Sequence, residues 1–185
     1  MPDDARHTWS AAATSATGVD ASVAEPPQRP GMLIALIVAI AFLMEQLDVT
    51  IVTTAIPDMA RALHTTAVQM SLAVSAYVLT LAVFIPLSGW CADRFGTRRV
   101  FTSALAVFTA GSVLCGMADS FAMLVATRVL QGLGGAMMTP VGRLILLRSF
   151  PRNQLVRAMT YMTFPAIVGP LIGPLLGGYL TTYLS

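Results

Sequence analysis

Five long runs of apolar residues, separated by short polar segments, dominate the sequence. They cover about residues 32–56, 70–91, 100–117, 121–147 and 158–183. A helix rises about 1.5 Å per residue, and about 17–25 apolar residues suffice to cross the hydrocarbon core of a bilayer. The pattern therefore predicts an all-α membrane protein with five transmembrane helices.

The composition agrees with this prediction. Of the 185 residues, 56% are hydrophobic and only 11% are charged, whereas soluble domains carry about 25% charged residues. The formal charge of +2 comes from arginines scattered between the apolar runs, so we expect no nucleic-acid partner. Residues 1–30 are polar and predict a disordered tail, and residues 31–185 form the membrane bundle.

The arginines are distributed unevenly between the two sides of the predicted membrane. The tail and the second and fourth connections carry eight of them, whereas the other connections carry only Arg61. Because basic loops stay in the cytoplasm, we expect a multi-pass membrane protein with a cytoplasmic N-terminus. The eight arginines are Arg6, Arg29, Arg94, Arg98, Arg99, Arg148, Arg152 and Arg157.

Two carboxyl groups fall inside the first apolar run. Glu45 and Asp48 are three residues apart and therefore share a face of the helix. Each costs about 2.5–3.5 kcal/mol near the centre of a membrane helix, so such residues mark functional sites. Asp48 lies eight or nine residues from Pro57, the expected outer end, at a depth of about 12–13 Å. Glu45 has no evident partner at its depth and is a candidate proton or cation binder.

Arg128 lies at a similar depth in the fourth run and could neutralise Asp48. Such a pair can hold a proton or release it when a substrate enters; a purely structural ion pair is the alternative. Arg128, Gly135 and Thr139 share a helical stripe, and Gln131, Gly135 and Thr139 are candidates to line a substrate cavity. We expect no catalytic residues, no metal site and no cofactor other than a proton gradient.

The fifth run carries glycines at every fourth position. Gly169, Gly173 and Gly177 leave a groove along one face, which permits close approach of a neighbouring helix. Proline residues within the run remove backbone donors, so we expect this helix to pack in protein or to face a cavity. The motif comprises Gly169, Pro170, Gly173, Pro174, Gly177 and Gly178.

Four segments together resemble the major facilitator superfamily, and in particular its fourteen-helix drug:proton antiporters. Residues 169–180 resemble the antiporter motif of the fifth helix, residues 47–57 the first-helix signature, and residues 128–136 the fourth-helix motif, whose arginine is implicated in proton transfer. Residues 89–99 resemble the loop between the second and third helices. Thr53 and Thr97 depart from the residues usual in the family.

The resemblance implies roles for the loop and the buried charges. The loop residues would form a cytoplasmic latch favouring the outward-open state, with Gly89 allowing close helix contact and Gly96 a tight turn; a loop that only sets the topology is the alternative. Glu45, Asp48 and Arg128 would couple transport to protons. The latch residues are Gly89, Asp93, Arg94, Gly96, Arg98 and Arg99. Arg143 is expected to reach the interface or, less favoured, to pair with Asp93.

The family builds each half from six helices, so five helices correspond to an incomplete N-terminal half-bundle. The resemblance implies that the full-length parent exports amphipathic drugs or toxic small molecules in exchange for protons, and that this chain alone, without the C-terminal helices, does not transport. A proton-coupled metabolite importer of the same superfamily and a non-transporting membrane fragment are the alternatives. An enzyme is not expected.

Overall fold

The computed structural model describes residues 29–183, and the tail predicted for residues 1–30 lies almost wholly outside this range. The described part of the chain consists of helices with no strand, which confirms the predicted fold class. All five long helices are long and apolar enough to cross a membrane. They are α2 (Arg29–Ala62), α3 (Ala67–Phe95), α4 (Thr97–Gly116), α5 (Phe121–Ser149) and α6 (Leu155–Tyr183), and the short 3-10 helix η1 (Arg152–Gln154) precedes α6.

Capping groups, rather than the limits of the apolar runs, set several helix ends. Thr66 and Gln69 form a capping box at the start of α3, and the Ser120 side chain accepts the backbone N–H of Met123 at the start of α5. These side chains satisfy N–H groups that have no partner within the helix. The α3–α4 connection is a single residue, Gly96, whose φ of +86° is a conformation that glycine adopts readily.

The first helix extends beyond the predicted end. Pro57 lies inside α2, which continues to Ala62 and carries an ion pair between Asp58 and Arg61 in its last turns. An exposed proline costs this helix one backbone hydrogen bond but does not end it. The prediction that α2 ends near Pro57 was therefore wrong, and the depth of Asp48 is not fixed by that residue.

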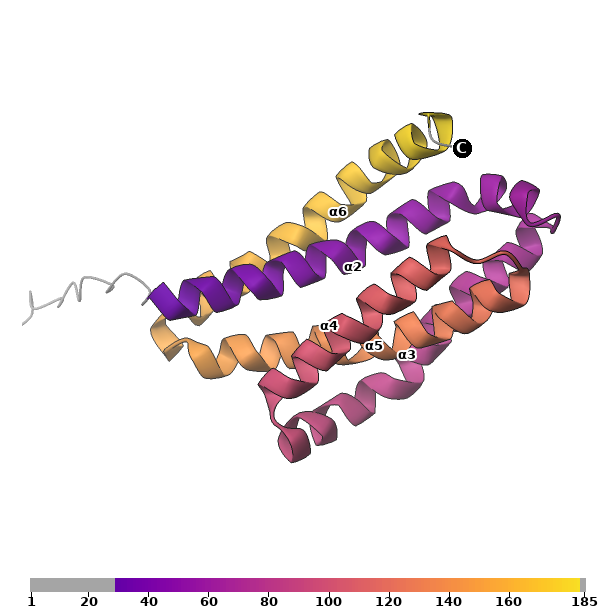
Figure 1. Cartoon of the computed structure of the whole chain (residues 1–185). Helices are drawn as coiled ribbons and strands as arrows, with labels where there is room; N and C mark the ends of the chain where they lie inside the picture. Colours follow the sequence, from indigo (N-terminus) through magenta and orange to yellow (C-terminus); the bar gives the residue numbers. More distant parts are fainter. Residues whose placement is uncertain (1–28, 184–185) are drawn as a thin grey trace, which may run out of the picture.

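Two groups of helices form the bundle (Figure 1). Helix α5 packs against α3 on one side and α4 on the other, whereas α2 runs beside α6 and also contacts α3 and α5. Glycines bring the backbones of the first group together. A Cβ atom on Gly134 of α5 would lie 2.6 Å from the backbone nitrogen of Phe108 in α4, and one on Gly132 would lie 3.0 Å from the carbonyl oxygen of Tyr77 in α3. No larger residue fits at these positions.

The glycine stripe of α6 faces α2. A Cβ atom on Gly169 would lie 2.5 Å from Cβ of Gln46, and one on Gly177 would lie 3.2 Å from Cβ of Thr54. Gly173 lies between them, directly against Thr50. Although three prolines lie within α6, it remains one continuous helix. Pro170 and Pro174 are exposed.

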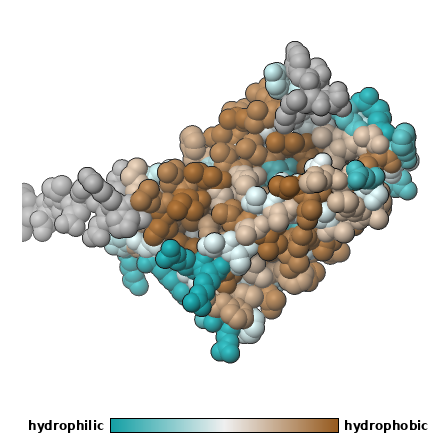
Figure 2. All heavy atoms as spheres, viewed as in Figure 1, coloured by the Kyte–Doolittle hydropathy of each residue, from teal (hydrophilic) through white to brown (hydrophobic). Residues whose placement is uncertain are grey.

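The surface of the bundle is apolar along its length. Figure 2 shows hydrophobic residues over the middle of the visible face and hydrophilic side chains gathered towards its ends. Large side chains such as Leu79, Val83, Leu171 and Leu175 are exposed. Soluble monomers rarely expose apolar surface of this extent, so these faces fit contact with lipid or with further membrane helices. The chain is a multi-pass membrane protein.

Candidate functional site

A buried ion pair joins α2 to α5. The Nη1 atom of Arg128 donates to Oδ2 of Asp48 across 2.7 Å, and the two side chains are only 3% and 11% exposed. The sequence placed the two groups at matching depth, and the structure brings them into contact. A charge-assisted hydrogen bond of this length is strong, and each charge compensates the other for loss of water.

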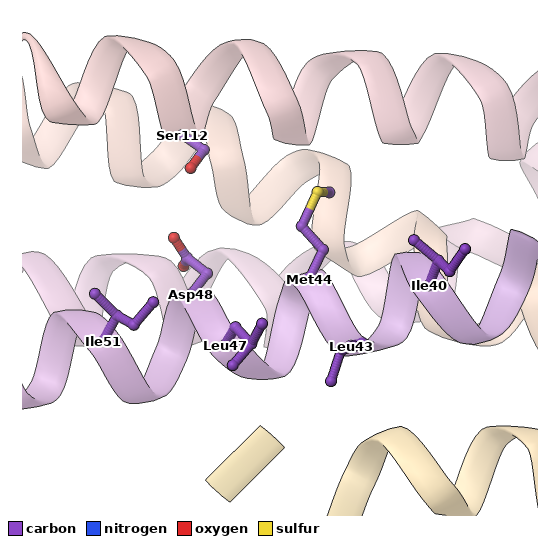
Figure 3. Close-up of a pocket in the computed structure, with 7 residues that line it drawn as sticks. All are labelled: Ile40, Leu43, Met44, Leu47, Asp48, Ile51 and Ser112. Atoms are coloured by element: carbon purple, nitrogen blue, oxygen red, sulfur yellow. The ribbon is translucent and has the colours of Figure 1, made fainter. Parts of the chain in front are cut away.

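Asp48 also lies at a groove between α2 and α4. The groove has a volume of about 450 Å³ and is lined almost wholly by apolar side chains. In Figure 3, the Asp48 carboxyl and the Ser112 hydroxyl project towards each other from the two helices. The lining residues are Ile40, Leu43, Met44, Leu47, Asp48, Ile51 and Ser112.

Glu45 has a partner that the sequence analysis did not identify. The Thr139 hydroxyl of α5 donates to Oε2 of Glu45 across 2.9 Å, and Glu45 is 8% exposed. The expectation that Glu45 lacks a partner was therefore wrong. Its partner is a neutral hydroxyl one turn of α5 beyond Gly135, whereas a charged residue at the same depth was expected to be needed. An ionised carboxylate and a protonated carboxyl can both accept this hydrogen bond.

Glu45 opens onto a second cavity, which lies between α2, α5 and α6. Its volume is about 420 Å³, and it holds both polar groups and methionine side chains. Methionine adapts to ligands of different shape, and a carboxylate attracts cations. Arg143, which was expected near the interface, also lines this cavity. The lining residues are Phe42, Glu45, Gln46, Thr139, Arg143, Met159, Met162, Thr163 and Ala166.

The three candidates for the cavity wall occupy different places. Thr139 lines the cavity beside Glu45. Gly135 lines neither of the two cavities, and a Cβ atom on it would lie 3.1 Å from Oη of Tyr77 and 3.5 Å from Oε1 of Glu45. Gln131 lines neither of the two cavities: it is fully buried against Gly111 of α4, and neither atom of its amide has a hydrogen-bond partner. Buried amides without partners are rare in proteins.

Tyr77 of α3 belongs to this cluster and was missed by the sequence analysis. It is 3% exposed, and its ring centroid lies 5.9 Å from the guanidinium carbon of Arg128. Its hydroxyl is buried without a hydrogen-bond partner. The sequence did offer one indication of its role: Tyr77 is a tyrosine within the second apolar run. A buried tyrosine usually has a polar group near its hydroxyl, so its position suggested polar neighbours on another helix.

Among the described residues, one ion pair involves the predicted latch loop, and its partner comes from outside the motif. Arg148, at the end of α5, donates to Asp93 at the end of α3 across 3.3 Å, and the two side chains are 55% and 71% exposed. The pairing considered between Asp93 and Arg143 is not formed. The sequence identified Arg148 only as a basic loop residue. Its pairing with Asp93 depends on the packing of α3 against α5, which places the two helix ends side by side and cannot be read from the sequence.

The remaining latch residues lie at the surface. Gly96 makes the expected tight turn. The expected close helix contact at Gly89 is absent among the described residues, since a Cβ atom there would meet nothing within 4 Å. Arg94, Arg98 and Arg99 are exposed. Within residues 29–183, no cluster of three His, Cys, Asp or Glu side chains could hold a metal ion.

Comparison with known proteins gives a consistent result. The family described as Major Facilitator Superfamily matches residues 38–185. Two curated relatives, from Klebsiella pneumoniae (strain 342) and Enterobacter sp. (strain 638), are 52% identical over 149 residues, and one from Salmonella paratyphi B is 50% identical over 149 residues. All three carry the name "Putative multidrug resistance protein MdtD". The match covers 80% of this chain and 32% of each relative, so the chain spans about a third of their length.

Proposed function

This chain belongs to the Major Facilitator Superfamily, and from that premise we propose that it contributes five transmembrane helices to a proton-coupled exporter of amphipathic drugs or toxic small molecules. The name of its relatives supports multidrug export. The matched segment is a third of their length, so the activity is proposed for a full-length protein, meaning the complete product that carries this sequence. Helices that follow this chain would complete the transport pathway.

The observation that carries the proposal is the buried cluster of two carboxyls and one arginine. Asp48 is held by Arg128, and Glu45 is held by Thr139 beside a cavity. Ionisable groups buried within membrane-spanning helices are costly and are retained where they bind protons or substrates. In this cluster a proton that binds a carboxylate removes its negative charge. A positive charge placed beside the carboxylate favours the ionised form and causes the proton to leave.

Competition between proton and substrate would drive export. When Asp48 takes up a proton, its attraction to Arg128 weakens, and α2 and α5 are no longer held by opposite charges. A cationic substrate in the cavity favours ionised Glu45, whereas a proton there removes the negative charge that binds the substrate. If the inward-facing and outward-facing states bind these two ligands with different affinity, inward proton flow shifts the equilibrium and expels the substrate.

The cavity next to Glu45 supports an amphipathic, cationic substrate class. One wall offers the Glu45 carboxylate and the Thr139 hydroxyl, Arg143 adds a positive charge to the lining, and another wall offers Met159 and Met162. Polar groups at one point and adaptable apolar groups elsewhere match molecules with one charge and a large apolar body. We further propose that the protein lies in a bacterial inner membrane, with the N-terminus and the Arg148 end of the bundle in the cytoplasm, because that end carries most of the arginines.

Transport direction in everted membrane vesicles tests the proposal. Vesicles containing the full-length protein should accumulate a fluorescent lipophilic cation when their lumen is made acidic, and an ionophore that dissipates the proton gradient should abolish the accumulation. Expulsion of the cation under the same gradient would indicate an importer instead. Lack of any gradient-dependent movement of cationic and neutral test compounds would contradict proton coupling.

A further inference from the structure

Tyr77 contacts the arginine of the ion pair with its ring and lies near Glu45 with its hydroxyl. It comes from α3, whereas Asp48 and Glu45 come from α2 and Arg128 from α5. Its backbone is fixed against α5, since its carbonyl oxygen would lie 3.0 Å from a Cβ atom on Gly132. Because the Tyr77 backbone packs closely against α5, the position of its side chain relative to α5 is restricted.

The ring of Tyr77 contacts the arginine of the ion pair. The guanidinium carbon of Arg128 lies 5.9 Å from the ring centroid, within the range of a cation–π interaction. The same guanidinium donates to Asp48. Because the guanidinium lies over the Tyr77 ring and also donates to Asp48, Tyr77 restricts the directions in which Arg128 can move when Asp48 releases it.

The hydroxyl of Tyr77 and the carboxyl of Glu45 converge beside Gly135. A Cβ atom on Gly135 would lie 3.1 Å from Oη of Tyr77 and 3.5 Å from Oε1 of Glu45. The absence of a side chain at Gly135 thus leaves room where these two oxygens approach each other. Oη is buried and has no hydrogen-bond partner, and one water between the two oxygens would join it to the carboxyl.

The charged and titratable groups around Tyr77 are few. Glu45 and Asp48 face the cluster from α2, and Arg128 faces it from α5. Arg143 of α5 lines the same cavity as Glu45. Helix α4 contributes Ser112, which does not titrate, on the far side of Asp48. Since Thr139 already donates to Oε2 of Glu45, Oε1 is the oxygen left for a second donor.

We propose that Tyr77 is a positioning residue that links the two carboxyl groups: its ring holds Arg128 on Asp48, and its hydroxyl donates to Glu45 when that residue is ionised. This inference rests on the proton-coupled export proposed above. It makes the two carboxyls dependent on each other, since loss of the proton from Glu45 draws the Tyr77 hydroxyl towards α2 and shifts the ring that supports Arg128. The proton released by Glu45 passes to water in the cavity, and Tyr77 keeps its own.

The test is the pH profile of export by the full-length protein carrying Tyr77→Phe. This variant keeps the ring beside Arg128 and removes only the hydroxyl, so accumulation in the membrane should be unchanged. Without the second donor, Glu45 keeps its proton to higher pH, and the pH of half-maximal export should move upwards by about one unit. Tyr161→Phe, which removes the same atom from a half-buried tyrosine of α6, is the matched control and should leave the profile unchanged.

Further variants keep the test decisive. Adding Tyr77→Phe to Glu45→Gln should cause no additional shift, because the hydroxyl then has no carboxylate to stabilise. If Tyr77→Phe does not accumulate, Gly135→Ala replaces it, since its methyl group would separate the same two oxygens and should produce the same upward shift. A wild-type profile in the substituted protein overturns the inference and leaves proton-coupled export in place. If export by the wild type does not respond to a proton gradient, both the role of Tyr77 and proton-coupled export are contradicted.

Discussion

Gly173 of α6 lies directly against Thr50 of α2, so that no side chain fits between the two helices at this point. The Thr50 hydroxyl is bonded to carbonyl groups of its own helix, which limits its ability to move aside. Gly173→Ala should therefore overpack this interface and lower the stability of the full-length protein by about 1–3 kcal/mol. Thermal unfolding in detergent measures the effect.

The matched control for this prediction is Gly178→Ala in the same helix. A Cβ atom at Gly178 would meet nothing within 4 Å in the part of the chain that the structure describes, so the unfolding temperature should remain close to that of the wild type. Equal losses of stability in the two variants would show that helix propensity, rather than contact with Thr50, determines the effect.

The buried ion pair should respond differently to single and double replacement. Arg128→Met leaves Asp48 without its partner and should reduce stability by about 3–5 kcal/mol, because the remaining charge is uncompensated. Adding Asp48→Leu removes that charge and should restore most of the stability and the amount of protein in the membrane. Transport should remain absent in the double variant, since the proton-binding group is gone. Transport by the double variant would show that the pair is purely structural.

Glu45 should determine the charge preference for substrates. Glu45→Gln keeps a side-chain oxygen that can accept from Thr139 but removes the negative charge beside the cavity. Export of monovalent cations should fall about tenfold or more, while export of neutral amphipathic compounds should fall much less. The control is Thr163→Val, which changes a residue of the same cavity whose hydroxyl bonds to its own helix. Equal loss of cationic and neutral substrates in Glu45→Gln would argue against charge recognition.

The pair between Asp93 and Arg148 should affect conformation rather than stability. Both side chains are largely exposed, and exposed ion pairs contribute at most about 1 kcal/mol. Asp93→Asn should therefore leave the unfolding temperature nearly unchanged but shift the equilibrium between inward-facing and outward-facing states, measured by labelling of single cysteines. Exchanging the two charges (Asp93→Arg with Arg148→Asp) should restore the equilibrium; failure to do so would exclude the pair as a latch.

The sequence was sufficient for the elements that depend on the physics of the bilayer. Hydrophobic runs predicted five helices because each apolar face must meet lipid or protein, and the matching depths of Asp48 and Arg128 predicted their pairing because buried charges need partners. Helix ends were predicted less well. The apolar run of the first helix stops near Pro57, whereas α2 continues through polar residues to Ala62, since exposed turns can remain helical without burying apolar surface.

Neutral polar groups were the main omission. Thr139 and Tyr77 carry no charge, so depth and charge could not identify them as partners of Glu45 and Arg128. Their positions depend on how α3 and α5 rotate about their axes, and the glycines at their interface set this rotation. A one-dimensional pattern indicates which face of a helix is small or polar, but not which residue of another helix it meets.

The central claim is that buried carboxyl groups exchange protons for substrate, and proton release tests it most directly. Everted vesicles with the full-length protein are given an acidic lumen, and a pH-sensitive dye reports the lumen when a lipophilic cation is added outside. The account predicts that the cation causes protons to leave the lumen with the wild type and that Asp48→Asn abolishes this flux. Proton flux in Asp48→Asn equal to that of the wild type would contradict the account.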